Sequence, residues 1–202
     1  MEGVTLSSAP APAPNTWGLP PPPTRRRTVW LVVVLGFMAA LIALLAIGLQ
    51  PRTSTLLQGK PAPDFVITAF NGEFNGRRFS SADLRGQIVV LNMWASWCLE
   101  CEKEAVALEQ AWQEYRDRGV WFIGVDYLDT DTAGSKYLSR FNITYPNGAD
   151  IGSRIYQDYR CTGVPETFFI DRSGIVQHIQ IGPIGQPQLF GLLDRLIEGG
   201  AS

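Results

Sequence analysis

The chain has 202 residues, 46% of them apolar, so it is long enough for one domain with a real core and too short for two large ones. Its formal charge of -2 at pH 7 gives it no basic surface of the kind that nucleic acid needs. We therefore expect one folded domain and no nucleic-acid partner.

The N-terminal segment, residues 1–28, is rich in proline. Seven of the fourteen prolines lie within residues 1–24, a composition typical of disordered or polyproline-like chain. Three arginines, Arg25, Arg26 and Arg27, follow. We interpret this segment as a cytoplasmic tail.

Residues 29–49 contain no charged side chain. At about 1.5 Å per residue they span roughly 32 Å as a helix, close to the thickness of the hydrocarbon core of a bilayer. A cleaved signal peptide usually has a shorter apolar region, and a buried helix of a soluble protein normally shows a polar stripe. We favour an uncleaved transmembrane anchor. The arginines before it, against Arg52 alone soon after it, predict a cytoplasmic N-terminus in the plasma membrane and an extracytoplasmic remainder.

A short linker, residues 50–60, precedes the globular domain expected over residues 61–199. Its elements follow from apolar runs, helical periodicity and turn residues. In chain order they are a strand over 87–94, a helix from Cys98 to Arg118, a strand over 120–126, a helix over 133–141, a hairpin of strands over 166–171 and 175–181, and a helix over 188–197. This order predicts an α/β fold with a mixed central sheet flanked by helices.

Two of the three cysteines, Cys98 and Cys101, stand three positions apart after the first strand. A structural zinc site needs four ligands, and the chain offers only Cys161 and His178 besides the pair, so we expect no metal and no cofactor. An inert disulfide would constrain the unfolded chain little over so small a loop. The free N–H groups and the dipole at the start of a helix favour a thiolate at Cys98. The pattern therefore favours a redox couple in which Cys98 is the nucleophile and Cys101, one turn deeper, resolves the mixed disulfide.

Three acidic residues, Glu100, Glu102 and Glu104, stand close to the expected thiolate. Their negative charge should favour the disulfide form and make the reduced protein a reductant. The alternative is that acids in a first helical turn simply complement the dipole.

The segment WCLEC after a buried strand, with GVPETFFID some sixty residues later, resembles the thioredoxin superfamily. More narrowly, residues 60–197 resemble the membrane-anchored TlpA-like thiol-disulfide oxidoreductases, which include the reductases of cytochrome c maturation. The resemblance implies a thioredoxin-like fold, with Trp97, Cys98 and Cys101 as the redox motif. It also implies a cis peptide bond before Pro165, packed beside that motif.

The same resemblance implies roles for the neighbours of this proline. The backbone of Val164 would be free to pair with an extended substrate segment. Glu166 resembles an acidic residue of the cytochrome c maturation branch, suited to accept or supply the proton that thiol exchange moves. The alternative for Glu166 is a strand-edge side chain in water.

The sequence departs from thioredoxins at Asn92, where they carry a buried acid. Leu99 and Glu100 also replace the residues often found between the cysteines. Away from the motif, we interpret Cys161 as a small buried side chain, with a third redox thiol as its alternative, and His178 as structural.

We therefore predict a membrane-tethered disulfide reductase. Its substrates would be disulfides of exported proteins, including apocytochrome c, and a membrane electron donor would regenerate it. One alternative is a peroxiredoxin-like thiol peroxidase, because APDF at residues 62–65 also occurs in such chains. Those enzymes require threonine or serine three residues before the peroxidatic cysteine, where this chain has Ala95. The other is a tethered interaction module with an inert disulfide.

Overall fold

The computed structural model describes residues 25–48 and 54–199, and the chain divides into two compact units, residues 1–50 and 51–202. Most of the predicted proline-rich tail, the last residue of the predicted anchor and the start of the predicted linker lie outside the described residues.

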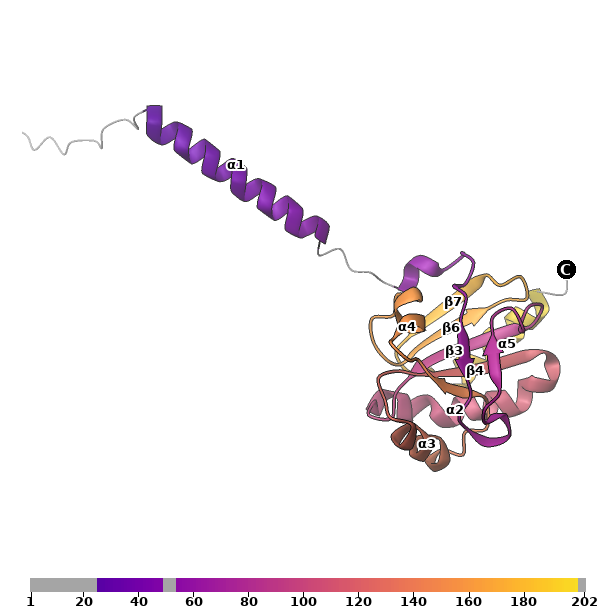
Figure 1. Ribbon diagram of the computed structural model, residues 1–202. Helices are drawn as coiled ribbons and strands as arrows, with labels where there is room; N and C mark the ends of the chain where they lie inside the picture. The colour runs from indigo at the N-terminus through magenta and orange to yellow at the C-terminus, as the bar shows by residue number, and fades with distance from the viewer. Residues whose placement is uncertain (1–24, 49–53, 200–202) are drawn as a thin grey trace, which may run out of the picture. The chain divides into compact units, whose positions relative to one another are not determined.

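The first unit contains one described helix, α1 (Arg25–Gly48), drawn in indigo in Figure 1. It starts at Arg25, within the predicted tail and four positions before the predicted anchor. Its residues 25–45 are long and apolar enough to cross a membrane, and none of these side chains is buried. The described part of this unit therefore has the length and composition of a membrane span.

The second unit combines helices with two sheets. Its α-helices are α2 (Leu99–Tyr115), α3 (Asp131–Arg140), α4 (Arg154–Asp158) and α5 (Gln186–Gly199). Its short 3₁₀ helices are η1 (Ser54–Leu57), η2 (Gly72–Phe74) and η3 (Arg116–Arg118). Its strands are β1 (Val66–Thr68), β2 (Arg78–Ser80), β3 (Ile88–Trp94), β4 (Val120–Asp126), β5 (Asn147–Ala149), β6 (Glu166–Ile170) and β7 (Val176–Ile181).

The main sheet has the strand order β5-β4-β3-β6-β7. Figure 1 labels β4, β3, β6 and β7 in this order across the sheet. Its central strand β3 runs parallel to β4 and antiparallel to β6, and β7 is antiparallel to β6. All seven residues of β3 are buried, as expected for an uninterrupted apolar run at the centre of a sheet. The predicted α/β fold with a mixed central sheet is confirmed.

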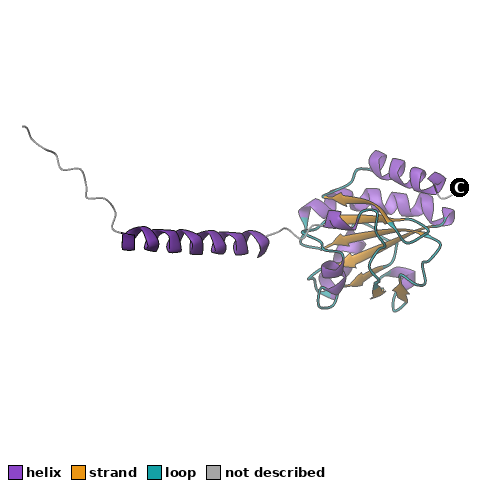
Figure 2. Ribbon diagram, turned by 90° about the horizontal axis from the view of Figure 1, so that it is seen from above, coloured by secondary structure: helices purple, strands orange, loops and turns teal. Residues whose placement is uncertain are grey.

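Helices cover both faces of this sheet. Figure 2 shows helices on both sides of the sheet. On one face, the Asn92 side chain of β3 donates a hydrogen bond to Glu104 of α2, and Tyr115 of α2 donates a hydrogen bond to Asp194 of α5. On the other face, Tyr159 at the end of α4 packs against Phe168 of β6, with ring centroids 4.8 Å apart. The sheet is thereby enclosed, and the end of β3 at Trp94 leads directly to the cysteine motif.

Strands β1 and β2 form a small antiparallel hairpin, and Ala69 joins it to β5 by a bridge to Gly148. The sequence did not indicate β1, β2, β5 or α4. The predicted helices and the predicted hairpin of β6 and β7 match observed elements, with small differences at their ends.

Candidate active site

Cys98 and Cys101 form a disulfide at the start of α2, with their Cα atoms 5.3 Å apart. Strand β3 ends at Trp94, a short turn follows, and Cys98 takes the N-cap position with an extended backbone. The Sγ atom of Cys98 accepts the backbone N–H of Cys101 at 3.0 Å. A sulfur therefore occupies the place where a helix N-terminus stabilises negative charge.

The two sulfurs differ in access to solvent. Cys98 is 6% exposed and Cys101 is 1% exposed, so an attacking or attacked partner reaches Cys98 first. Around Cys98, the apolar side chains of Trp97, Leu99 and Leu128 are exposed. The indole N–H of Trp97 donates to the carbonyl of Leu128 at 3.3 Å, which ties the side chain to the loop after β4. These side chains give the surface beside Cys98 an apolar rim.

The Val164–Pro165 peptide bond is cis, as the resemblance implies. The carbonyl oxygen of Val164 lies 3.5 Å from the Sγ atom of Cys98, so this loop and the disulfide are neighbours. The N–H of Val164 has no hydrogen-bond partner among residues 25–48 and 54–199. It is free to bond the backbone of a bound segment.

Glu166 is fully buried, so the alternative of a water-exposed side chain is wrong. Its Oε1 atom accepts hydrogen bonds from both the N–H and the hydroxyl of Thr162, each at 2.8 Å. Its Oε2 atom is buried without a partner in the described part of the chain. The carboxyl group is thus held through Oε1 by Thr162, in the segment that leads to Pro165.

Glu104, on α2, is a site residue whose place the sequence analysis missed. It is 1% exposed, and it accepts the Asn92 side-chain N–H at 2.8 Å and the Ile184 backbone N–H at 3.0 Å. Burial raises the pKa of Glu104 to about 7, although these two hydrogen bonds act to lower it. Asn92 cannot titrate, yet it holds a carboxyl group that does. The helical spacing could have indicated the burial of Glu104, because this residue lies on the same face of α2 as the buried residues Cys101, Ala105 and Leu108.

The AhpC/TSA family matches residues 58–179 of this sequence. The chain belongs to the AhpC/TSA family. The thiol-disulfide oxidoreductase ResA of Bacillus thuringiensis (strain Al Hakam) is 33% identical over 138 residues, which cover 68% of this chain and 78% of the relative. It follows that this AhpC/TSA family member is a thiol-disulfide oxidoreductase.

Solved structures agree with this family placement. A thioredoxin-family thiol:disulfide interchange protein from Chlorobium tepidum TLS is 27% identical to this chain. The match covers 69% of this chain and 97% of the Chlorobium protein, with a TM-score of 0.62. A secreted Mycobacterium tuberculosis disulfide oxidoreductase, homologous to E. coli DsbE, is 25% identical to this chain. The match covers 65% of this chain and 96% of the M. tuberculosis protein, with a TM-score of 0.58. The thioredoxin-like fold implied by the resemblance is confirmed.

The charges at the start of α2 differ from those expected. In this AhpC/TSA family member, Glu100 is paired with Lys103 and Glu102 with Arg140, and Glu104 is buried. Because two of the three acids have cationic partners, the argument that all three charges favour the disulfide loses much of its weight. The buried carboxyl of Glu104 remains as the acid that shares the inner face of α2 with Cys101.

Two aspartates lie behind the turn that precedes Cys98. The Oδ2 atom of Asp129 accepts the Ser96 N–H at 2.7 Å and so holds this turn. Asp126 is 3% exposed, and burial raises its pKa to about 8, with further contributions from Asp129 and Asp131. Asp129 therefore holds the turn of the redox motif, and the buried carboxyl group of Asp126 lies next to it.

Cys161 and His178 are the two other residues that the sequence analysis weighed. Cys161 is a free, half-buried cysteine, and burial followed by the charge of Glu166 raises the pKa of its thiol well above the ordinary value. His178 packs against Phe169 at 5.7 Å between ring centroids, in keeping with its structural interpretation. Within residues 25–48 and 54–199, no three His, Cys, Asp or Glu side chains are grouped so as to hold a metal ion.

Proposed function

We propose that this thiol-disulfide oxidoreductase is a membrane-anchored disulfide reductase that works outside the plasma membrane. The observation that carries the proposal is the disulfide at the start of α2, with Cys98 the more exposed sulfur and the free N–H of Val164 beside it. A reactive sulfur and a free backbone donor are what a protein disulfide needs for binding and exchange.

In the reduced enzyme, the thiolate of Cys98 attacks one sulfur of a target disulfide. A bond forms between Cys98 and that sulfur, and the other target sulfur leaves as a thiolate that takes up a proton. Cys101 loses its proton and attacks the Sγ atom of Cys98, which breaks the mixed disulfide and releases the second target thiol. Two electrons and two protons pass to the target, and the Cys98–Cys101 disulfide seen here is the product.

The local contacts support this division of labour. The N–H of Cys101 already points to the Sγ atom of Cys98, so it is placed to stabilise the attacking thiolate. Cys101 is almost fully buried and can reach only the sulfur beside it. The buried carboxyl groups of Glu104 and Glu166 are the candidates to take the proton that Cys101 gives up.

The proposed arrangement in the cell has a single-pass anchor over residues 29–49, to which α1 contributes residues 29–48, and has residues 1–28 in the cytoplasm. The linker 50–60 then leads to the catalytic domain of residues 61–199 outside. The apolar length of α1 supports its role as an anchor. The three arginines at its start support a cytoplasmic N-terminus. A membrane protein with its own dithiol would supply the electrons.

Among exported substrates, we favour apocytochrome c. Its CxxCH thiols must be reduced before haem attachment, and the sequence resembles the reductases of cytochrome c maturation. The apolar rim of Trp97, Leu99 and Leu128 suits an unfolded segment with exposed apolar residues.

The test is a trapping experiment with the full chain in its membrane. In the Cys101→Ser variant, a mixed disulfide at Cys98 has no resolving thiol, so target proteins should accumulate covalently on the enzyme. The matched control is Cys98→Ser, which keeps one buried thiol and should trap little. Apocytochrome c or its maturation factors on Cys98 would support the proposal. Equal trapping by both variants, or a trap without exported proteins, would contradict it.

The thiol peroxidase alternative is tested on the same protein. Ala95, which stands where peroxiredoxins want a hydroxyl side chain, is fully buried and supplies none. We expect no consumption of hydrogen peroxide beyond that of the Cys98→Ser control, and no sulfenic acid at Cys98. The interaction-module alternative requires instead that mild dithiothreitol leave the disulfide intact.

A further inference from the structure

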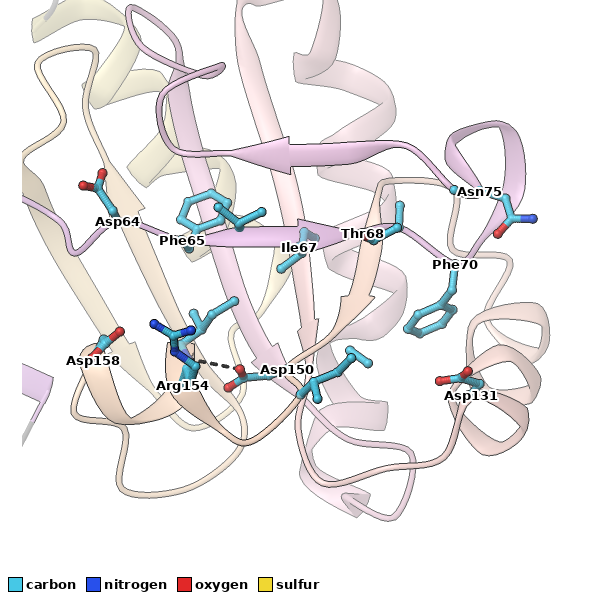
Figure 3. A pocket seen from close by; sticks show the side chains of 16 residues that line it. Asp64, Phe65, Ile67, Thr68, Phe70, Asn75, Asp131, Asp150, Arg154 and Asp158 are labelled. Carbon is cyan, nitrogen blue, oxygen red and sulfur yellow. Dashed lines mark hydrogen bonds between the residues drawn. The ribbon is translucent and has the colours of Figure 1, made fainter.

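A groove of about 700 Å³ lies between β1 and the segment that joins β5 to α4 (Figure 3). Ile67 and Ile155 are buried beneath it, whereas Val66 and Ile151 are exposed at its rim, Ile151 by 87%. None of the residues that line it belongs to the redox motif. The groove is therefore a second concave surface with apolar contacts of its own.

The backbone of β1 presents an open edge to this groove. The carbonyl of Phe65 accepts the Ser81 N–H and the N–H of Ala69 donates to the Arg77 carbonyl, so alternate residues from Phe65 to Ala69 bond β2. Asp64, Val66 and Thr68 consequently direct their backbone groups the other way. No acceptor for the N–H of Val66 is found outside the strands in the described part of the chain, whereas Thr68 lies beside the bridge that joins Ala69 to Gly148 of β5.

Strand β5 reaches this edge at one end. The N–H of Phe70 donates to the Asn147 carbonyl at 2.9 Å, and Ala69 forms a bridge with Gly148. The chain then turns away through Asp150 into α4. The position beside Val66 is thus a place where a strand would continue the pairing that β5 begins.

The rim of the groove is acidic. Its lining includes Asp64, Asp131, Asp150 and Asp158, against Arg154 as the single cationic side chain among these residues. Asp150 is occupied with the backbone N–H groups at the start of α4, but the other three acids are exposed. Figure 3 shows Asp64 and Asp158 at one end of β1 and Asp131 at the other.

We propose that this groove binds an extended segment of a partner protein as an added strand on β1. The segment has β-branched residues in its centre, to contact Val66 and Ile151, and a lysine or arginine at each end, to meet the acids. Such strand addition takes its affinity from main-chain hydrogen bonds and its selectivity from side chains. A second copy of this chain is disfavoured as the occupant, because its β1 edge would bring like charges together.

Binding is tested with the full chain in detergent micelles and the acetylated, amidated peptide Lys-Val-Thr-Val-Lys, labelled for fluorescence anisotropy. The charge-reversed peptide Glu-Val-Thr-Val-Glu should bind about tenfold more weakly or worse. The Lys peptide with every backbone N–H methylated should lose binding to a similar degree, because it cannot pair with an edge strand. Hydrogen exchange at Val66 should slow when the Lys peptide binds.

The matched variant is Val66→Pro, which removes one N–H that points into the groove and leaves the bonds to β2 in place. It should weaken the Lys peptide about tenfold while thermal unfolding and disulfide exchange stay unchanged. The methylated peptide keeps the test decisive if this variant folds poorly. The proposal is overturned if the three peptides bind alike, if the Lys peptide fails to bind, or if sedimentation shows a self-association that Val66→Pro abolishes.

Discussion

Replacing Glu104 by glutamine should change how the stability of the protein depends on pH. Both oxygens of this carboxyl group accept hydrogen bonds, from Asn92 and from Ile184. Glutamine has one acceptor oxygen, but rotation of the Asn92 amide would let its oxygen accept from the new side-chain N–H. The variant should therefore keep the local structure and lose only the titration.

The size of the effect follows from the raised pKa. Burial takes the pKa of Glu104 from its ordinary value of 4.5 to about 7. An acid with a raised pKa holds its proton more tightly in the folded state, so its contribution to stability is complete below pH 4.5 and is lost as the pH rises through 7. The shift corresponds to roughly 3 kcal/mol between these limits.

The assay is urea unfolding of the oxidised full chain in detergent at several pH values from 4.5 to 8, followed by tryptophan fluorescence. Relative to the Glu104→Gln variant, the wild type should lose about 3 kcal/mol of unfolding free energy across this range. The matched control is Glu100→Gln, since Glu100 is an exposed residue of the same helix. If the difference in unfolding free energy between the wild type and Glu104→Gln stays constant with pH, the assignment of a raised pKa to Glu104 is refuted.

Three other changes have expected outcomes. Gly124→Ala should destabilise the protein by about 1–3 kcal/mol in urea unfolding, because a methyl group at this position of β4 overlaps the buried side chain of Asn147. Burial raises the pKa of Asp126 to about 8, so the wild type should become less stable as the pH rises through 8. Asp126→Asn should not show this decrease in unfolding free energy, and the same pH profile in both proteins would contradict the prediction. Iodoacetamide at pH 8 should leave Cys161 unlabelled in the native protein, because its raised pKa keeps the thiol protonated, and peptide mapping by mass spectrometry would detect any modification.

The elements that the sequence predicted are those long enough to carry a pattern. Strand β3 is seven buried residues and α2 repeats apolar residues over 17, so both stand out from their surroundings. Strands β1, β2 and β5 have three residues each, too few for an alternation to be distinguished from loop. Their existence depends on pairing with segments far away in the chain, which no local propensity records.

The site shows the same division between local and distant information. The ion pair of Glu100 with Lys103 was within reach of sequence reasoning, because residues three apart on a helix are neighbours. The partner of Glu102 was not, since Arg140 lies on α3, 38 positions along the chain. The burial of Glu166 likewise depends on β3 and β7 on either side of it. Roles that depend on the third dimension had to come from the structure.

The position of Glu104 connects the redox motif to the rest of the sheet. This carboxyl group bonds the side chain of Asn92 on β3 and the backbone of Ile184, two residues beyond Gly182, whose N–H donates to the carbonyl of Pro165. Reduction of the disulfide adds a thiolate at the start of the same helix, and a nearby like charge raises the pKa of an acid further. We therefore expect the reduced enzyme to keep the proton of Glu104 to a higher pH than the oxidised enzyme does. On this expectation oxidation favours release of that proton, and urea unfolding of the reduced and oxidised wild type against Glu104→Gln over the same pH range would reveal the coupling.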